Sequence, residues 1–176
     1  MKRSFFAILM VSLFLAGCAA VQSLVRSTFP YTATVTVPAG GKPGTAQSVT
    51  AMASSFDQIF TGQTSNTSAV KDIRLSSVRV DVNSPAGQSL RIFKSIKIYI
   101  SRGDSYKEHL IAASNDIPSS TASSLLLDAD TQTLLDEYIK GSTVRVRLEY
   151  ELREGLLRDI VLKASLGFDA LPATAG

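Results

Sequence analysis

Hydrophobic and polar residues alternate along most of this chain, with the period of a β-strand that has one buried face. The clearest stretch is Val144–Leu152, where Val, Leu and Tyr alternate with Arg and Glu. Ile160–Phe168 alternates in the same way after the turn at Glu154–Gly155, so we expect these two strands to form an antiparallel hairpin. Further strands are expected at Tyr31–Val37, Ile73–Val82, Leu90–Ile100, His109–Ser114 and Leu125–Leu127.

Two of these strands contain irregularities. In Ile73–Val82 the apolar residues move from odd to even positions at Ser76–Ser77, which predicts a β-bulge or a bend. Lys94 interrupts the apolar face of Leu90–Ile100.

Two short segments have a helical period instead. Val49, Met52 and Phe56 fall at helical spacing, which predicts a short amphipathic helix over Ser48–Phe60. A second helix is expected over Thr131–Lys140, because its apolar residues share one face and Gly141 follows as a C-terminal cap.

About seven strands with two short helices and no βαβ rhythm predict a mainly all-β domain. We expect an antiparallel two-layer β-sandwich, immunoglobulin-like or jelly-roll-like, over residues 31–171. Residues 172–176 are expected to be a C-terminal tail.

The N-terminus has the pattern of a secretory signal. Lys2 and Arg3 precede the apolar run Phe5–Leu15, which is shorter than the roughly 20 residues a spanning helix needs. The sequence Leu15-Ala16-Gly17-Cys18 resembles the lipobox of bacterial lipoproteins. This resemblance implies that residues 1–17 are a signal peptide removed before Cys18. It also implies that the Cys18 sulfur is lipidated and that the new amino group is acylated.

The resemblance also implies a location. Ala19 follows the cysteine, where an Asp would retain an enteric-type lipoprotein in the inner membrane, and no acidic run follows that would favour surface display. We therefore expect the outer membrane and its periplasmic face. Residues 18–30 are expected to be a lipidated tether, and its ten residues from Ala19 to about Thr28 extend at most about 35 Å. Lipid, short tether and sandwich are also the plan of the transthyretin-like lipoproteins of secretion machines.

Composition narrows the function classes. The chain has 18 basic and 15 acidic residues, but without Lys2 and Arg3 the basic count falls to 16 and the net charge to +1. Nucleic-acid binding needs a concentrated basic face, so we expect no nucleic-acid partner. With Cys18 bound to lipid, no intramolecular disulfide is possible.

The candidate binding residues are Tyr99, Arg102, Asp104 and Tyr106, which surround one expected turn. Arg102–Ser105 reads Arg-Gly-Asp-Ser, the sequence of integrin ligands, but Gly-Asp is also an ordinary hairpin turn. Exposed aromatic rings stack on sugars, so Tyr99 and Tyr106 are candidates for binding cell-wall glycan.

Catalytic and metal sites are weakly indicated. Glu149 and Glu151 point to one side of a strand, about 7 Å apart, a separation at which carboxylates hydrolyse glycosides. Arginines share that face, which favours a solvated row of charges. Asp128, Asp130 and Glu137 lack the Gly of a calcium loop, and Asp130 or Thr131 is better explained as a cap.

His109, the one histidine, cannot build a multi-histidine zinc site. We expect no catalytic residue, no metal and no cofactor. The expected function is therefore a non-catalytic, lipid-anchored envelope protein that binds a protein partner or assists assembly of an outer-membrane complex. A carbohydrate- or peptidoglycan-binding module is the alternative, and a hydrolase is less favoured. The expected contact loops are Pro38–Gly44, Gly62–Ser68, Arg102–Ser105 and Ile117–Ser124.

Overall fold

The computed structural model describes most of the chain from Ser27 to Pro172. Cys18, Asp104 and the expected loop Gly62–Ser68 lie outside the described residues. The described ranges are 27–55, 70–103, 105–139 and 143–172.

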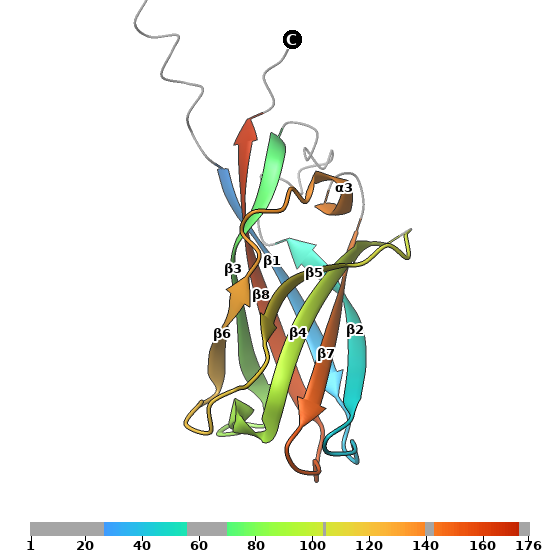
Figure 1. The fold of residues 1–176 in the computed structure, drawn as a ribbon, viewed down its shortest axis with the longest axis vertical. Helices are drawn as coiled ribbons and strands as arrows, with labels where there is room; N and C mark the ends of the chain where they lie inside the picture. Colours follow the sequence, from blue (N-terminus) through green and yellow to red (C-terminus); the bar gives the residue numbers. More distant parts are fainter. Residues whose placement is uncertain (1–26, 56–69, 104, 140–142, 173–176) are drawn as a thin grey trace, which may run out of the picture.

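Eight antiparallel strands close into a barrel (Figure 1). Their order around the barrel is β1-β2-β7-β4-β5-β6-β3-β8. The mainly β, antiparallel fold is confirmed, whereas a sandwich of about seven strands is not. The strands are β1 (Ser27–Val37), β2 (Ala46–Ser55), β3 (Val70–Ser84), β4 (Phe93–Arg102), β5 (His109–Ser114), β6 (Ser124–Ala129), β7 (Val144–Leu152) and β8 (Ile160–Pro172).

The barrel is closed at two seams. Among the described residues, β1 and β2 pair at Tyr31↔Ser55 and Thr32↔Ser54. β5 and β6 pair only at Ala112↔Ala129 and Ala113↔Asp128. Between the seams, β1, β8, β3 and β6 form one set of neighbours and β2, β7, β4 and β5 form the other. The alternation of each strand fits either architecture, and these few pairs join the two sets into a barrel without free edges.

The predicted hairpin of β7 with β8 is wrong. β7 pairs with β2 and β4, whereas β8 pairs with β1 and β3. Residues 153–159 therefore cross from one set of strands to the other. Because alternation determines which residues face the interior and not which strands are neighbours, the sequence pattern is the same for both connections.

Both predicted irregularities lie where the strand register changes. The pairing of β3 with β8 shifts between Leu75 and Ser77, which confirms the predicted bulge. The pairing of β4 with β7 shifts between Phe93 and Ser95, so Lys94 points outward while Phe93 and Ile96 are buried.

The two predicted amphipathic helices are largely replaced by other structure. The described part of Ser48–Phe60 belongs to strand β2, whose inner side chains include the small Ala51 and Ala53. Of Thr131–Lys140, one turn of helix forms, α3 (Asp136–Ile139). A 3-10 turn, η3 (Leu90–Ile92), occupies the start of the strand expected at Leu90.

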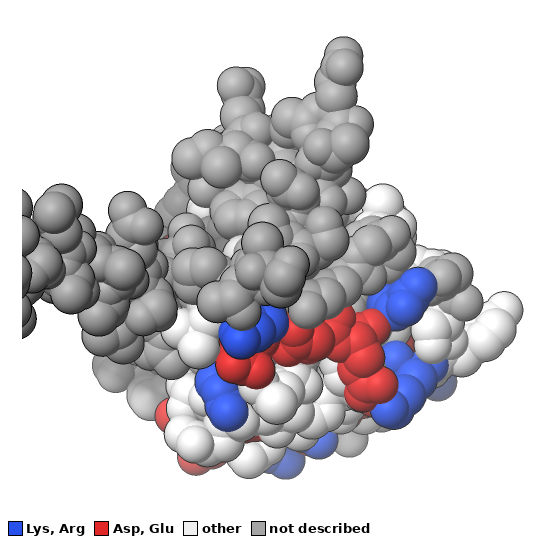
Figure 2. Space-filling view, turned by 90° about the horizontal axis from the view of Figure 1, so that it is seen from above, with Lys and Arg blue, Asp and Glu red and all other residues white. Residues whose placement is uncertain are grey.

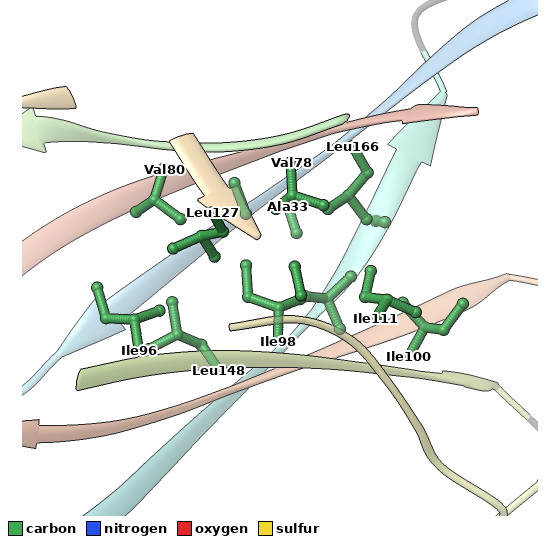
Figure 3. Packing of buried hydrophobic residues seen from close by; sticks show 14 of the residues in the cluster. Ala33, Val78, Val80, Ile96, Ile98, Ile100, Ile111, Leu127, Leu148 and Leu166 are labelled. Atoms are coloured by element: carbon green, nitrogen blue, oxygen red, sulfur yellow. The ribbon is translucent and has the colours of Figure 1, made fainter. Parts of the chain in front are cut away.

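Apolar side chains from both sets of strands fill the barrel interior (Figure 3). Ile96, Ile98 and Leu148 face Val80 and Leu166 across it. An eight-stranded barrel has an interior that side chains can fill, so this is a packed core. The labelled core residues are Ala33, Val78, Val80, Ile96, Ile98, Ile100, Ile111, Leu127, Leu148 and Leu166.

The barrel has two distinct ends. The end we call the α3 end carries α3, the β4–β5 connection, the start of β1 and the end of β8 (Figure 1). The opposite end, which we call the Leu157 end, carries the connections 38–45, 85–92, 115–123 and 153–159. In the part of the chain that is described, no helix is long and apolar enough to span a bilayer.

Candidate functional site

Two of the four candidate binding residues are placed at the α3 end. Arg102 is the last residue of β4, and Tyr106 lies in the following connection with 98% of its surface exposed. Asp104 is outside the described residues. Gly103 is held to the start of β7, because its N–H donates to the Thr143 carbonyl at 2.8 Å.

A cavity of about 330 Å³ lies beside this connection. Its lining brings polar side chains of the connection against α3. Lys107 Nζ donates to Glu137 Oε1 at 2.8 Å, and this hydrogen bond lowers the pKa of Glu137 and raises that of Lys107. The lysine charge is thus already partnered within the chain. The lining residues are Arg102, Ser105, Lys107, Glu137 and Tyr138.

Asp130 organises the chain that leads into α3. Its Oδ1 accepts the N–H groups of Gln132 and Thr133 at 3.0 and 3.2 Å. Its Oδ2 accepts Thr133 Oγ1 at 2.6 Å and lies 3.3 Å from His109 Nε2. These bonds, that of the Thr133 hydroxyl above all, lower the pKa of Asp130 to about 2. The predicted capping role of Asp130 is confirmed, although it caps a turn that precedes α3.

Asp128, Asp130 and Glu137 are the acidic residues that a calcium site in this region would use. The described residues contain no group of three or more His, Cys, Asp or Glu side chains arranged to hold a metal ion. Both carboxylate oxygens of Asp130 accept hydrogen bonds from its own turn, which is the observation that disfavours it as a calcium ligand.

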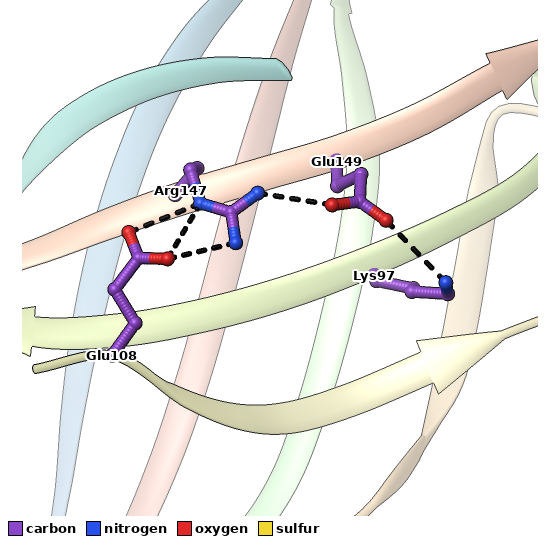
Figure 4. A network of polar contacts seen from close by, with 4 residues as sticks. All are labelled: Lys97, Glu108, Arg147 and Glu149. Atoms are coloured by element: carbon purple, nitrogen blue, oxygen red, sulfur yellow. Dashed lines mark hydrogen bonds and ion pairs between the residues drawn. The ribbon is translucent and has the colours of Figure 1, made fainter. Parts of the chain in front are cut away.

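Glu149 and Glu151, the two candidate catalytic glutamates, both lie in ion pairs on the outer face of the barrel, and Figure 4 shows those of Glu149. Glu149 Oε2 is 3.1 Å from Arg147 Nη1, and Glu149 Oε1 is 3.3 Å from Lys97 Nζ. Glu151 is paired with Lys94 at 2.9 Å. The hydrogen bond from Arg147 lowers the pKa of Glu149. A glycosidase needs one carboxyl with a raised pKa as general acid, and these surroundings have the opposite effect on Glu149.

The two candidate tyrosines do not form a shared stacking surface. The Tyr99 ring is covered by Arg147, whose Cζ lies 4.0 Å from the ring centroid. Arg147 is fixed there by Glu108, which it contacts at 2.8 Å through Nη2. The guanidinium therefore occupies the ring face on which a sugar would stack.

A second candidate site lies at the Leu157 end, beside the turn expected at Glu154–Gly155. Leu157 has 98% of its surface exposed, and a cavity of about 430 Å³ lies beside it. The cavity is lined by both polar and apolar surface, and two of its side chains, Glu154 and Arg158, are ionisable. Its lining residues are Pro85, Ala86, Gly87, Gln88, Ile92, Glu154, Gly155, Leu156, Leu157 and Arg158.

Backbone hydrogen bonds hold the connections of the Leu157 end together. Gly40 N–H donates to the Leu156 carbonyl at 3.0 Å, and Arg153 N–H donates to the Ile92 carbonyl at 2.8 Å. The Ala39 N–H donates to Asp159 Oδ1 at 2.8 Å. The cavity is therefore built on linked turns, and a ligand would meet a preformed surface.

The signal for this site was present in the sequence. Leu156 and Leu157 are adjacent apolar residues in the connection 153–159, which is otherwise polar or Gly. One of them can enter the core, and the other is then left without a place in it. Of the expected contact loops, Pro38–Gly44 and Ile117–Ser124 lie at this same end, whereas Arg102–Ser105 lies at the α3 end.

Comparison with known proteins gives no family. No protein-family model matches the chain, and no curated protein matches it. Among solved structures, the crystal structure of FLHE is similar over 84% of this chain and 98% of its own, with 8% identity and a TM-score of 0.33. A structure of desmodium yellow mottle tymovirus is similar over 86% of this chain and 91% of its own, with 10% identity and a TM-score of 0.28.

Proposed function

We propose that this chain is a non-catalytic, lipid-anchored protein of the outer membrane, facing the periplasm, that binds a protein partner through the Leu157 end of its barrel. The anchor is the lipidated Cys18 that the lipobox resemblance implies. The observation that carries the binding role is the exposed Leu157 beside a cavity of mixed polar and apolar lining.

An exposed leucine side chain can still contribute hydrophobic free energy when a partner buries it. Complete burial of such a side chain contributes about 1.5–3 kcal/mol. Ile92 and Pro85 line the same cavity, so a partner side chain placed there would cover apolar surface on several connections at once. Glu154 and Arg158 border it with opposite charges, which can fix the orientation of a polypeptide partner.

The position of this end supports the same role. β1 starts at the α3 end, so a chain anchored through Cys18 attaches to the membrane on that side (Figure 1). The Leu157 end is then the one directed away from the bilayer, toward other envelope proteins.

The test is in-cell crosslinking and pull-down of the full-length, lipidated protein. We expect one stoichiometric envelope protein to be recovered with the natural sequence and to be lost with Leu157→Asp. Leu126→Asp is the matched control, because Leu126 is also exposed but lies on the side of the barrel, in β6. A Cys18→Ala variant tests whether the complex needs the anchor.

Recovery of the same partner with Leu157→Asp contradicts the proposed surface. If only lipid and cell-wall fragments are recovered, the glycan-binding alternative gains support and the protein-partner proposal fails.

A further inference from the structure

We propose that the α3 end of the barrel rests on the lipid surface, with Tyr106 at the level of the headgroups. This inference rests on the proposed lipid anchor and adds to it the orientation of the barrel and the surface that contacts the bilayer.

The distance between anchor and barrel is short. Eight residues, 19–26, separate Cys18 from Ser27, where β1 begins. An extended chain covers at most about 3.6 Å per residue, so these residues span roughly 30 Å or less. β1 itself has 11 residues, about 36 Å at the rise of a strand. The tether is therefore shorter than the barrel, and the α3 end is the one that it keeps near the bilayer.

The sides of the barrel formed by β4, β7 and β1 are poorly suited to contact with lipid. The outer face of β4 and β7 carries the ion pairs Lys94–Glu151 and Lys97–Glu149. The outer face of β1 carries the exposed residues Thr34 and Thr36. Placing ion pairs against lipid removes their water, which costs several kcal/mol per ion. A barrel that lies on the side formed by β4, β7 and β1 is therefore disfavoured.

The α3 end offers a different chemistry. Tyr106 is almost completely exposed, and Leu134, just before α3, and Met52, near the end of β2, are each about half exposed. A tyrosine ring has an apolar body and a polar hydroxyl, which suits the boundary between headgroups and water. Lys107, next to Tyr106, can keep its charged group in water while its stem lies along apolar surface.

The charges of this end are mixed. Viewed from above, acidic side chains of the described residues form a row with basic side chains on either side of it (Figure 2). Glu137 on α3 is already paired with Lys107. We therefore expect the contact to depend on the covalent lipid rather than on the charge of the membrane.

The experiment uses a fluorophore placed at each end of the full-length, lipidated protein. Cys18 is the one cysteine and its sulfur is blocked by lipid, so an introduced cysteine can be labelled specifically. Tyr106→Cys and Leu157→Cys form a matched pair, because both positions are 98% exposed. The protein is reconstituted into phosphatidylcholine vesicles that contain headgroup-proximal, spin-labelled phosphatidylcholine.

We expect the spin label to quench the fluorophore at position 106 at least threefold more than the fluorophore at position 157. The ratio should change little when phosphatidylglycerol is added. A third label, at Thr34→Cys on the exposed side of β1, tests the sideways orientation. Equal quenching at positions 106 and 157, or stronger quenching at position 34 than at 106, overturns the proposal.

Mass spectrometry of the same samples separates a failure of this inference from a failure of the proposed lipid anchor on which it rests. If Cys18 carries no lipid, the proposed anchor itself is wrong. If Cys18 carries the lipid and position 106 is not the most strongly quenched, the anchor stands and the orientation is wrong.

Discussion

Leu156 and Leu157 are neighbours in the β7–β8 connection, yet 6% of Leu156 and 98% of Leu157 are exposed to solvent. The Leu156 carbonyl accepts the Gly40 N–H, which ties this residue to the β1–β2 connection and holds its side chain in the core. The next side chain is consequently directed outward. One residue of this pair is expected to serve stability and the other to serve binding.

This division predicts different outcomes for the same substitution. Leu156→Ala removes a buried side chain and should lower the free energy of unfolding by about 2–4 kcal/mol. Leu157→Ala removes an exposed one and should change it by less than about 0.5 kcal/mol. Urea unfolding of the purified protein in detergent micelles measures both. A comparable loss in the two variants would show that Leu157 is packed in solution.

Arg147 is predicted to stabilise the outer face through its planar guanidinium. It stacks on Tyr99 and contacts Glu108 and Glu149 at 2.8 and 3.1 Å. Arg147→Ala should lower the free energy of unfolding by about 1–2 kcal/mol, the sum of a stacked cation and two partly exposed ion pairs. Arg147→Lys should recover less than half of this, because an ammonium cannot form the same forked contacts. Full recovery with lysine would mean that charge alone matters.

Asp130 is predicted to contribute to stability in acid. Hydrogen bonds hold its folded-state pKa at about 2, below the value of about 3.9 expected in the unfolded chain. A depressed pKa gives stability that is present above pH 4 and is lost as the pH falls toward 2. Asp130→Asn should therefore reduce the decline in unfolding free energy between pH 4 and pH 2. Glu149 also has a lowered pKa, so part of the decline should remain in Asp130→Asn. Glu149→Gln should remove a part of that remainder. An unchanged decline in Asp130→Asn would contradict the stabilising role assigned to the Asp130 carboxylate.

Gly167 is predicted to be required by the bulge of β3. A Cβ atom at this position would lie 2.8 Å from the hydroxyl oxygens of Ser76 and Ser77. Gly167→Ala should therefore lower the free energy of unfolding by about 1–2 kcal/mol. Replacing both serines by alanine in the same protein removes the two oxygens and should restore most of the loss.

Gly155→Ala is the matched control for Gly167→Ala, since nothing lies within 4 Å of a Cβ placed there. It should be neutral or stabilising by up to about 1 kcal/mol. If the double serine substitution fails to restore Gly167→Ala, the serine hydroxyls are not the cause of its cost.

The features that could be predicted from sequence are those that depend on local alternation. The strands β7 and β8 and the bulge at Ser76–Ser77 follow directly from which residues face the core. β2 could not be recognised, because its inner face includes Ala51 and Ala53, whose small side chains give little hydrophobic signal. Its conformation comes from pairing with β7, a strand far away in the sequence.

Prediction of the candidate sites was limited in the same way, because the sites depend on contacts between segments that are far apart in the sequence. Arg102 lines one cavity with Glu137 and Tyr138 of α3, and this neighbourhood depends on where the strands lie in the barrel. The cavity at the Leu157 end joins the β3–β4 and β7–β8 connections, which are about 70 residues apart. A period read along the chain contains no information about such neighbours, and an exposed leucine becomes notable only once the core is known.

The pairing of β1 with β8 has a mechanical consequence. The eleven residues of β1, from Ser27 to Val37, each pair with a residue of β8. Tension between an anchor before Ser27 and a partner at the Leu157 end would pull along these strands. The hydrogen bonds between them would then be loaded together, in shear, instead of opening one after another like a zipper. With the proposed anchor and partner in place, this geometry would let the barrel transmit force from the partner to the membrane without unravelling from its anchored end.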